Sequence, residues 1–282
     1  MESNRLRIGV KLDARTLDRG EFLADAEAFE AAGADGLWLS EGLFRSAGDE
    51  PRHPPGLDAW TLLAGVAAVT TRVRLGTSVS VPTMWPPAVF AAMVTTLDHL
   101  SRGRVVVGVG AGWEPAQFGA VGLGFTDRGA RLDEFLAAVR HLWSNPKEPF
   151  DGTFYSLPPL AMAPPFQPQG PPIFVGAFSE RGYRRAARLT DGFIHGGGTP
   201  DQVAPVFEHL RELRSRAGRD EPFDLWLQVA SPRDRAAWRE TLDAIVPTGA
   251  TGVIVPASSR LLEILRNPDD EGDRSDLLLA QG

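Results

Sequence analysis

Eight short apolar segments, separated by helical patterns, are the feature of this chain that most constrains its fold. Short apolar runs bounded by turn residues are typical of buried strands, whereas apolar stripes at helical spacing are typical of helices packed on one face. Strict alternation of the two favours an α/β fold, a closed (β/α)8 TIM barrel, over an open doubly wound sheet. The predicted strands are Leu6–Leu12, Gly36–Ser40, Val73–Ser80, Arg104–Val109, Pro172–Gly176, Gly192–His195, Phe223–Val229 and Gly252–Pro256.

Helix ends carry signals of their own. Proline is favoured in the first helical turn and glycine just beyond the last, so we expect Pro86-Pro87 to begin a helix and Gly103 to end it. This helix is predicted to place its apolar residues on one face: Val89, Phe90, Met93, Leu97 and Leu100. Further helices are expected after Asp127, after Ser179, from Thr199-Pro200 and from Pro232.

Two long stretches interrupt the alternation, at 45–56 and at about 145–171. The second lies between the fourth helix and the fifth strand and is rich in proline and aromatic residues. Because it has apolar content to bury, we expect it to be ordered, as a lid or as a dimer contact. The acidic tail from about 267 to 282 is expected to be solvated and mobile. The whole chain, 1–282, is predicted to be a single domain.

Composition narrows the class of protein. The chain has no cysteine, which excludes disulfides and thiolate chemistry. Its net charge of −7 argues against nucleic-acid binding, and no apolar run is long enough to cross a membrane. The first residues lack the pattern of a signal peptide. We therefore expect a cytoplasmic protein that acts on a small molecule.

In a barrel, functional groups gather where strands end. The segments that follow the predicted strands supply the candidate binding residues: Ser40, Thr77, Ser78, Val79, Gly110, Gly112, Gly176, Ala177, Phe178, Ser179, His195, Gly196 and Gly197. The segments after Gly176 and His195 each precede a helix, whose free amides favour an anion. They indicate either a phosphate site or ordinary tight turns.

Glu41, Trp113 and Glu114 are the candidate catalytic residues. A carboxylate at the mouth of a barrel can act as an acid or a base, or it can have a structural role. Trp113 is placed to stack on a flat ring. The five histidines are scattered, so we expect no metal site. The sequence motifs of serine hydrolases, dinucleotide-binding folds and Walker nucleotide sites are absent.

The ordered motifs along nearly the whole chain resemble the bacterial luciferase-like superfamily of flavin- and deazaflavin-dependent barrel oxidoreductases. The segments that carry the resemblance are Ala34–Glu41, Leu75–Val79 with Pro82, Thr96–Asp98 with Leu100–Arg104, Gly108–Trp113, Arg131–Glu134, Leu142-Trp143, Phe150–Gly152, Pro172–Gly176, Arg184–Leu189 and Asp191-Gly192. The chain is most similar to the branch that uses the deazaflavin coenzyme F-420.

This resemblance implies a planar cofactor across the barrel mouth, backed by a non-proline cis peptide at Ser78-Val79. It places the cofactor phosphate near 176–179 and 195–199, the same turns already proposed for an anion. It implies hydride transfer between reduced coenzyme F-420 and a small organic substrate, and a homodimer. The alternatives are a monooxygenase that uses flavin mononucleotide (FMN) and a non-catalytic barrel.

The chain departs from the family pattern after the second strand. Many relatives have Asp-His there, with the histidine near the reacting ring, whereas this chain has Glu41-Gly42. Assistance by an imidazole at that position is therefore excluded. Either Glu41, Glu114 or Trp113 assists, or the protein mainly positions the cofactor.

Overall fold

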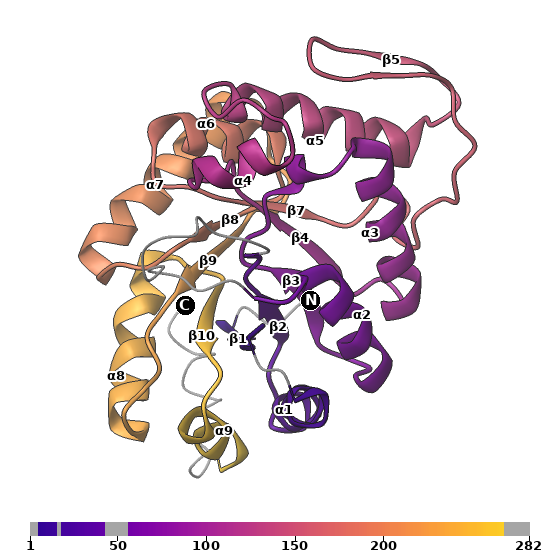
Figure 1. The fold of residues 1–282 in the computed structure, drawn as a ribbon. Helices are drawn as coiled ribbons and strands as arrows, with labels where there is room; N and C mark the ends of the chain where they lie inside the picture. The colour runs from indigo at the N-terminus through magenta and orange to yellow at the C-terminus, as the bar shows by residue number, and fades with distance from the viewer. Residues whose placement is uncertain (1–4, 16–17, 43–55, 268–282) are drawn as a thin grey trace.

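The strands close into a barrel, as the alternation predicts. The computed structural model describes residues 5–15, 18–42 and 56–267. In this part, eight parallel strands form a closed sheet in the order β1-β10-β9-β8-β7-β4-β3-β2 (Figure 1). Their bounds are β1 Arg7–Lys11, β2 Gly36–Leu39, β3 Arg74–Thr77, β4 Val105–Val109, β7 Ile173–Gly176, β8 Gly192–His195, β9 Asp224–Gln228 and β10 Gly252–Pro256. Most of the stretch at 45–56 and nearly all of the acidic tail lie outside the described residues.

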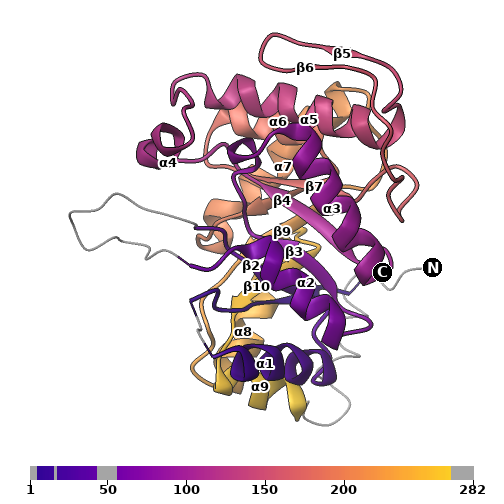
Figure 2. The same cartoon turned by 45° about the vertical axis from the view of Figure 1, so that its right-hand side comes forward.

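Helices surround the barrel (Figures 1 and 2). They are α1 Arg19–Ala31, α2 Ala59–Val69, α3 Pro87–Ser101, α4 Pro115–Ala120, α5 Arg128–Ser144, α6 Glu180–Leu189, α7 Pro200–Arg216, α8 Arg235–Ile245 and α9 Ser259–Arg266, with the short 3₁₀ helices η1 Pro82–Met84 and η2 Val246–Thr248. Ser179 caps α6 as expected. The prediction for α8 was wrong by three residues, because Asp234, not the turn at Pro232, accepts the amide of Ala237 and begins the helix.

Aromatic side chains fill the barrel interior. The inward-facing cluster consists of Trp38, Val106, Phe174, Ile194, Trp226 and Ile254. The rings of Trp38 and Trp226 lie 5.1 Å apart. Neighbouring strands make room for them with glycine, since a Cβ on Gly76 would lie 2.5 Å from Trp38 Cζ3 and one on Gly9 would lie 2.4 Å from its Nε1. The barrel is therefore a packed core and not a channel.

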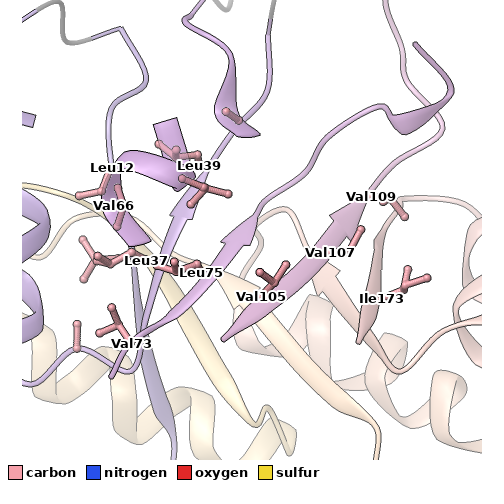
Figure 3. Close-up of a cluster of buried hydrophobic side chains, with 14 of the residues drawn as sticks. Leu12, Leu37, Leu39, Val66, Val73, Leu75, Val105, Val107, Val109 and Ile173 are labelled. Atoms are coloured by element: carbon pink, nitrogen blue, oxygen red, sulfur yellow. The ribbon is translucent and has the colours of Figure 1, made fainter. Parts of the chain in front are cut away.

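The outward-facing strand residues form a second apolar layer beneath the helices. Figure 3 shows aliphatic side chains of this layer on adjacent strands, together with Val66 of α2. They include Leu37, Leu39, Leu75, Val105, Val107, Val109 and Ile173, each at most 1% exposed. Apolar residues on both strand faces explain why these strands appear in the sequence as continuous hydrophobic runs.

The apolar face predicted for α3 was wrong in part. Phe90 and Leu97 are buried, but Val89 and Leu100 are 54% and 58% exposed. The buried face of the helix also includes polar residues, among them Asp98, whose carboxylate accepts hydrogen bonds from the backbone and side-chain amides of Gln167. Which residues of α3 are buried is therefore decided by hydrogen bonds to the insertion as well as by apolar side chains.

The insertion is ordered and lies on the flank of the barrel. It contains a small hairpin, β5 Phe150–Asp151 with β6 Ser156–Leu157, which projects beyond α5 (Figures 1 and 2). Glu134 of α5 accepts hydrogen bonds from the amides of residues 153, 154 and 155. These contacts attach the hairpin to α5 and not to the barrel axis.

Candidate functional site at the barrel mouth

The residues that face the mouth follow from the two-residue period of the strands. Side chains at alternate positions point to the same face, so the residue two places beyond each member of the aromatic layer faces the mouth. The inward-facing positions of the aromatic layer are Gly9, Trp38, Gly76, Val106, Phe174, Ile194, Trp226 and Ile254. Two residues further along each strand lies the layer that we call the floor, which consists of Lys11, Ser40, Ser78, Gly108, Gly176, Gly196, Gln228 and Pro256. One side of the layer is polar and the other is made of glycine.

Hydrogen bonds connect the polar side of the floor. The Nζ of Lys11 donates to Oε1 of Gln228 over 3.1 Å. The Nε2 of Gln228 donates to Oγ of Ser78 over 3.0 Å and contacts the Ser78 carbonyl at 3.4 Å. The same carbonyl accepts from Oγ of Ser40 over 3.0 Å. Residues at the ends of three other strands, β1, β2 and β9, thus fix one backbone segment at the end of β3.

Val79 covers the glycine side of the floor. A Cβ on Gly110 or on Gly176 would lie 2.9 Å from a methyl group of Val79, so the valine packs directly on two bare backbones. The peptide bond between Ser78 and Val79 is cis, as the resemblance implied. The buried Thr77 side chain points outward and donates to the carbonyl of Gly108 over 2.6 Å. The result is a low apolar surface beside the polar network.

The candidate catalytic residues lie at the rim of the mouth. Oε2 of Glu41 accepts the amide of Val81 over 2.9 Å, so this carboxylate braces the segment that carries the cis bond. Glu114 occupies the N-cap position of α4, where its side chain makes no capping hydrogen bond. The Trp113 side chain is 58% exposed. The turn at Gly112 adopts a φ of 82°, which favours glycine. None of these positions belongs to the floor layer.

The two helix starts predicted to bind an anion differ in the structure. At α6, Oγ of Ser179 accepts the amide of Gly182 over 3.4 Å, and no described residue accepts the first two amides of the helix. At α7 the first residue is Pro200, which has no N–H, and Thr199 and Gln202 cap each other. Since free amides attract an anion, α6 is the stronger candidate.

His195 does not face the mouth. Its ring packs against Phe178, Phe193 and Phe207, with centroids 5.4, 6.2 and 6.3 Å away, and is 7% exposed. Burial lowers its pKa, and a contact with the Gly197 backbone only partly opposes this. The strand period explains the orientation, because Ile194 occupies the inward position. Phe178, in contrast, is 72% exposed between the two turns.

Sequence reasoning missed Lys11 and Gln228. Both end a strand, and both follow an inward-facing residue by two positions, which was the available signal. Burial lowers the pKa of Lys11, and the negative charge of Asp13 partly opposes that shift. Gln228 also lines a groove of about 730 Å³ that runs from residues 196–198 along the inner side of α8.

Two classes of site are not found among the described residues. No group of three or more histidine, aspartate or glutamate side chains in this part of the chain is placed to hold a metal ion. No helix within the same residues is both long enough and apolar enough to span a bilayer.

Comparison with known proteins settles the family. The model of the family described as luciferase-like monooxygenase matches residues 6–276. The chain is a member of this luciferase-like family. Its members are oxidoreductases or monooxygenases, and its relatives use coenzyme F-420 or a flavin.

Individual relatives agree with this assignment. An uncharacterized protein of Mycobacterium tuberculosis is 35% identical over 214 residues, which cover 71% of this chain and 73% of the relative. An F-420-dependent glucose-6-phosphate dehydrogenase of Kineococcus radiotolerans is 34% identical over 223 residues, covering 77% and 64%. A solved F-420-dependent secondary alcohol dehydrogenase superimposes with a TM-score of 0.81 at 17% identity, covering 93% of this luciferase-like chain and 96% of the other; this likeness concerns the fold.

Proposed function

We propose that this luciferase-like protein transfers hydride between reduced coenzyme F-420 and a small organic substrate at the barrel mouth. The observation that carries the proposal is the divided floor, with a low apolar surface at Val79 beside the polar side chains of Ser40 and Gln228. The F-420-dependent relative from Kineococcus, at 34% identity, favours the deazaflavin over FMN.

The residues at the floor fit a planar ring with one polar edge. The valine on two glycines offers a surface without projecting side chains, against which a flat ring packs. The polar side offers donors from the Lys11 amine, the Gln228 amide and the Ser78 hydroxyl. Beneath both, the aromatic layer seals the barrel, so a bound molecule enters and leaves through the mouth.

The start of α6 fits the phosphate of such a cofactor. The first two amides of the helix, which no described residue accepts, and the positive end of the helix dipole favour an anion. Phe178, exposed between this turn and Gly196, shields the same region. The turn after His195 then contributes backbone atoms to the wall of the phosphate site, and the imidazole of His195 does not take part.

When bound, the deazaflavin supplies the hydride chemistry, and the protein supplies position and charge. The network of Ser40, Ser78 and Gln228 fixes the backing segment, and Glu41 braces it through Val81. Glu114 and Trp113, on the rim, are the candidates to contact the substrate. No imidazole occupies the position at Gly42.

The second candidate is an FMN-dependent monooxygenase, which the description of the family model favours. Titrating the purified protein with F-420 and with FMN, while following fluorescence quenching, separates the candidates. We expect F-420 to bind at least about tenfold more tightly, a difference of about 1.4 kcal/mol. The reverse order favours the monooxygenase, and binding of neither contradicts both and favours the non-catalytic barrel.

We further propose that the protein is cytoplasmic and a homodimer. Val89 and Leu100, exposed on the outer side of α3, support the dimer, because apolar side chains gathered on one helix are typical of an interface. The absence of cysteine is compatible with a reducing compartment.

A further inference from the structure

Lys11 occupies a distinctive place in the floor layer. Among the eight inward-facing positions of that layer, all within the described residues, Lys11 carries the one formal charge, and none is aspartate or glutamate. Its amine reaches the centre of the polar side through Gln228, which contacts Ser78. A positive charge therefore stands at the closed end of the mouth.

Two other inward-facing basic groups have a carboxylate partner. Arg7 and Arg74, at the opposite end of the barrel, both pair with Asp224. Lys11 instead donates to a neutral amide oxygen, and no carboxylate of the described residues lies within ion-pair distance of its Nζ. Asp13 influences it only at longer range and pairs with Arg15 over 2.6 Å.

A half-buried ammonium with no carboxylate among the described residues in direct contact is costly unless another partner compensates it. The amine is also an exception in composition, since Lys11 and Lys147 are the two lysines among 29 basic residues. A lysine presents a compact point charge, whereas the larger planar arginine fork suits bidentate partners. A compact amine suits one oxygen atom at a time, whether that of a carbonyl, of an alkoxide or one oxygen of a carboxylate.

We propose that Lys11 binds a negatively polarised oxygen of the molecule that occupies the mouth. This inference deepens the proposed redox function and rests on it. Two sources offer such an oxygen, a carbonyl on the ring of the cofactor and the carbonyl or alkoxide oxygen of the substrate. In either case the amine stabilises negative charge beside the reacting centre, which is where fixed charge has the largest effect on a transition state.

The two lysines make a direct test practical. Protein labelled with ¹³C at lysine Cε should give two resonances, and Lys147→Met assigns them. We would titrate this sample with F-420, with FMN and with sodium acetate, a probe for a small oxyanion. The Lys11 resonance should shift with the ligand whose oxygen it binds, while that of Lys147, which is exposed on the insertion, should remain in place.

A variant series measures the contribution. Lys11→Met removes the charge but keeps a side chain of similar length. It should weaken the binding of the ligand that shifts the Lys11 resonance by at least about tenfold. Lys11→Arg keeps the charge and should recover part of the affinity, and Lys147→Met should change nothing. Circular dichroism establishes that each variant is folded.

The outcomes separate the two proposals. A shift with a cofactor assigns the oxygen to the cofactor, and a shift with acetate alone assigns it to the substrate side. Another outcome is that fluorescence shows a cofactor to bind while no ligand shifts the Lys11 resonance. In that case the role of Lys11 is refuted, whereas the redox function stands. If no cofactor binds, the redox function fails, and acetate alone decides whether the amine binds an oxyanion.

Discussion

The side-chain amide of Gln228 lies 3.0 Å from the hydroxyl of Ser78, although 150 residues separate them in the chain. Gln228 ends β9 and Ser78 follows β3, and closure of the barrel directs both toward the same space. This contact ties the backing segment of the candidate site to the far side of the barrel. It also connects that segment to Lys11.

Gln228→Ala should therefore weaken cofactor binding more than it weakens the fold. Loss of one buried hydrogen bond costs about 0.5–1.5 kcal/mol, which corresponds to a rise in the dissociation constant of roughly two- to tenfold. Fluorescence titration measures it. Ser231→Ala is the control, since Ser231 lies beyond the same strand and donates to the carbonyl of Pro256. Equal affinities for both variants would show that the network does not support the site.

Gly76→Ala tests the aromatic layer. Its new Cβ would lie 2.5 Å from Trp38 Cζ3, and such overpacking typically costs about 1–3 kcal/mol. Urea unfolding should show a lower midpoint with little change in slope. Gly119→Ala in α4 meets no atom within 4 Å and should be neutral or slightly stabilising. Two indistinguishable curves would refute the tight fit around Trp38.

Substitutions of Ser179 can change the charge at the start of α6 while the residue still caps the helix. Serine, aspartate and asparagine cap helices about equally well, so Ser179→Asp and Ser179→Asn differ mainly in charge. If the first turn of α6 holds a phosphate, the aspartate variant should bind cofactor at least about tenfold more weakly than the asparagine variant. Comparable binding by both variants would remove this turn from the site.

Glu134 gives the hairpin of the insertion a dependence on pH. Burial raises the pKa of Glu134, but the hydrogen bonds from the amides of Phe154, Tyr155 and Thr153 outweigh burial and hold the pKa below 4.5, its ordinary value. A carboxyl with a lowered folded pKa stabilises above its unfolded value, and this stabilisation is lost as the pH falls through the folded pKa. Hydrogen-exchange protection of residues 153–155 should thus decrease below about pH 4.5.

The variant Glu134→Gln supplies the comparison for this experiment. It removes the charge that these amides contact, so the hairpin should be less protected at pH 7 and should show little further loss in acid. Protection in the variant that matches the unaltered protein at both pH values would exclude Glu134 as the anchor.

Val89→Asp tests the dimer. A charge on the exposed apolar side of α3 should shift the protein toward monomer in sedimentation velocity, because an unpaired charge in an interface is costly. Ala24→Asp places the same charge at an exposed position of α1, on a different helix, and should have a smaller effect. A protein that is monomeric without either change would refute the homodimer outright.

Much of the fold was predictable because its determinants are local. Each of the eight predicted strands is present, and its ends differ from the predicted ends by at most three residues. The reason is that apolar runs and turn residues depend on neighbours in the chain. The helix starts at Ser179 and Thr199 could also be predicted from the sequence. The resemblance pointed to the cis bond at Ser78-Val79.

The direction of side chains was less predictable. The ring of His195, at the end of β8, packs in an aromatic cluster, and Val89 was expected to be buried but is exposed. A shift of one position along a strand, or of about 100° around a helix, exchanges inside for outside. Only packing against a particular neighbour decides between the two.

The sequence by itself determined the alternation of strands and helices, the capped helix starts and the family of the chain, because these depend on residues close together in the chain. The tertiary structure decided that Lys11, Ser40, Ser78 and Gln228 share one floor. Their strands become neighbours or face each other only when the barrel closes, and no local pattern records which distant side chains will then lie within a hydrogen-bond length.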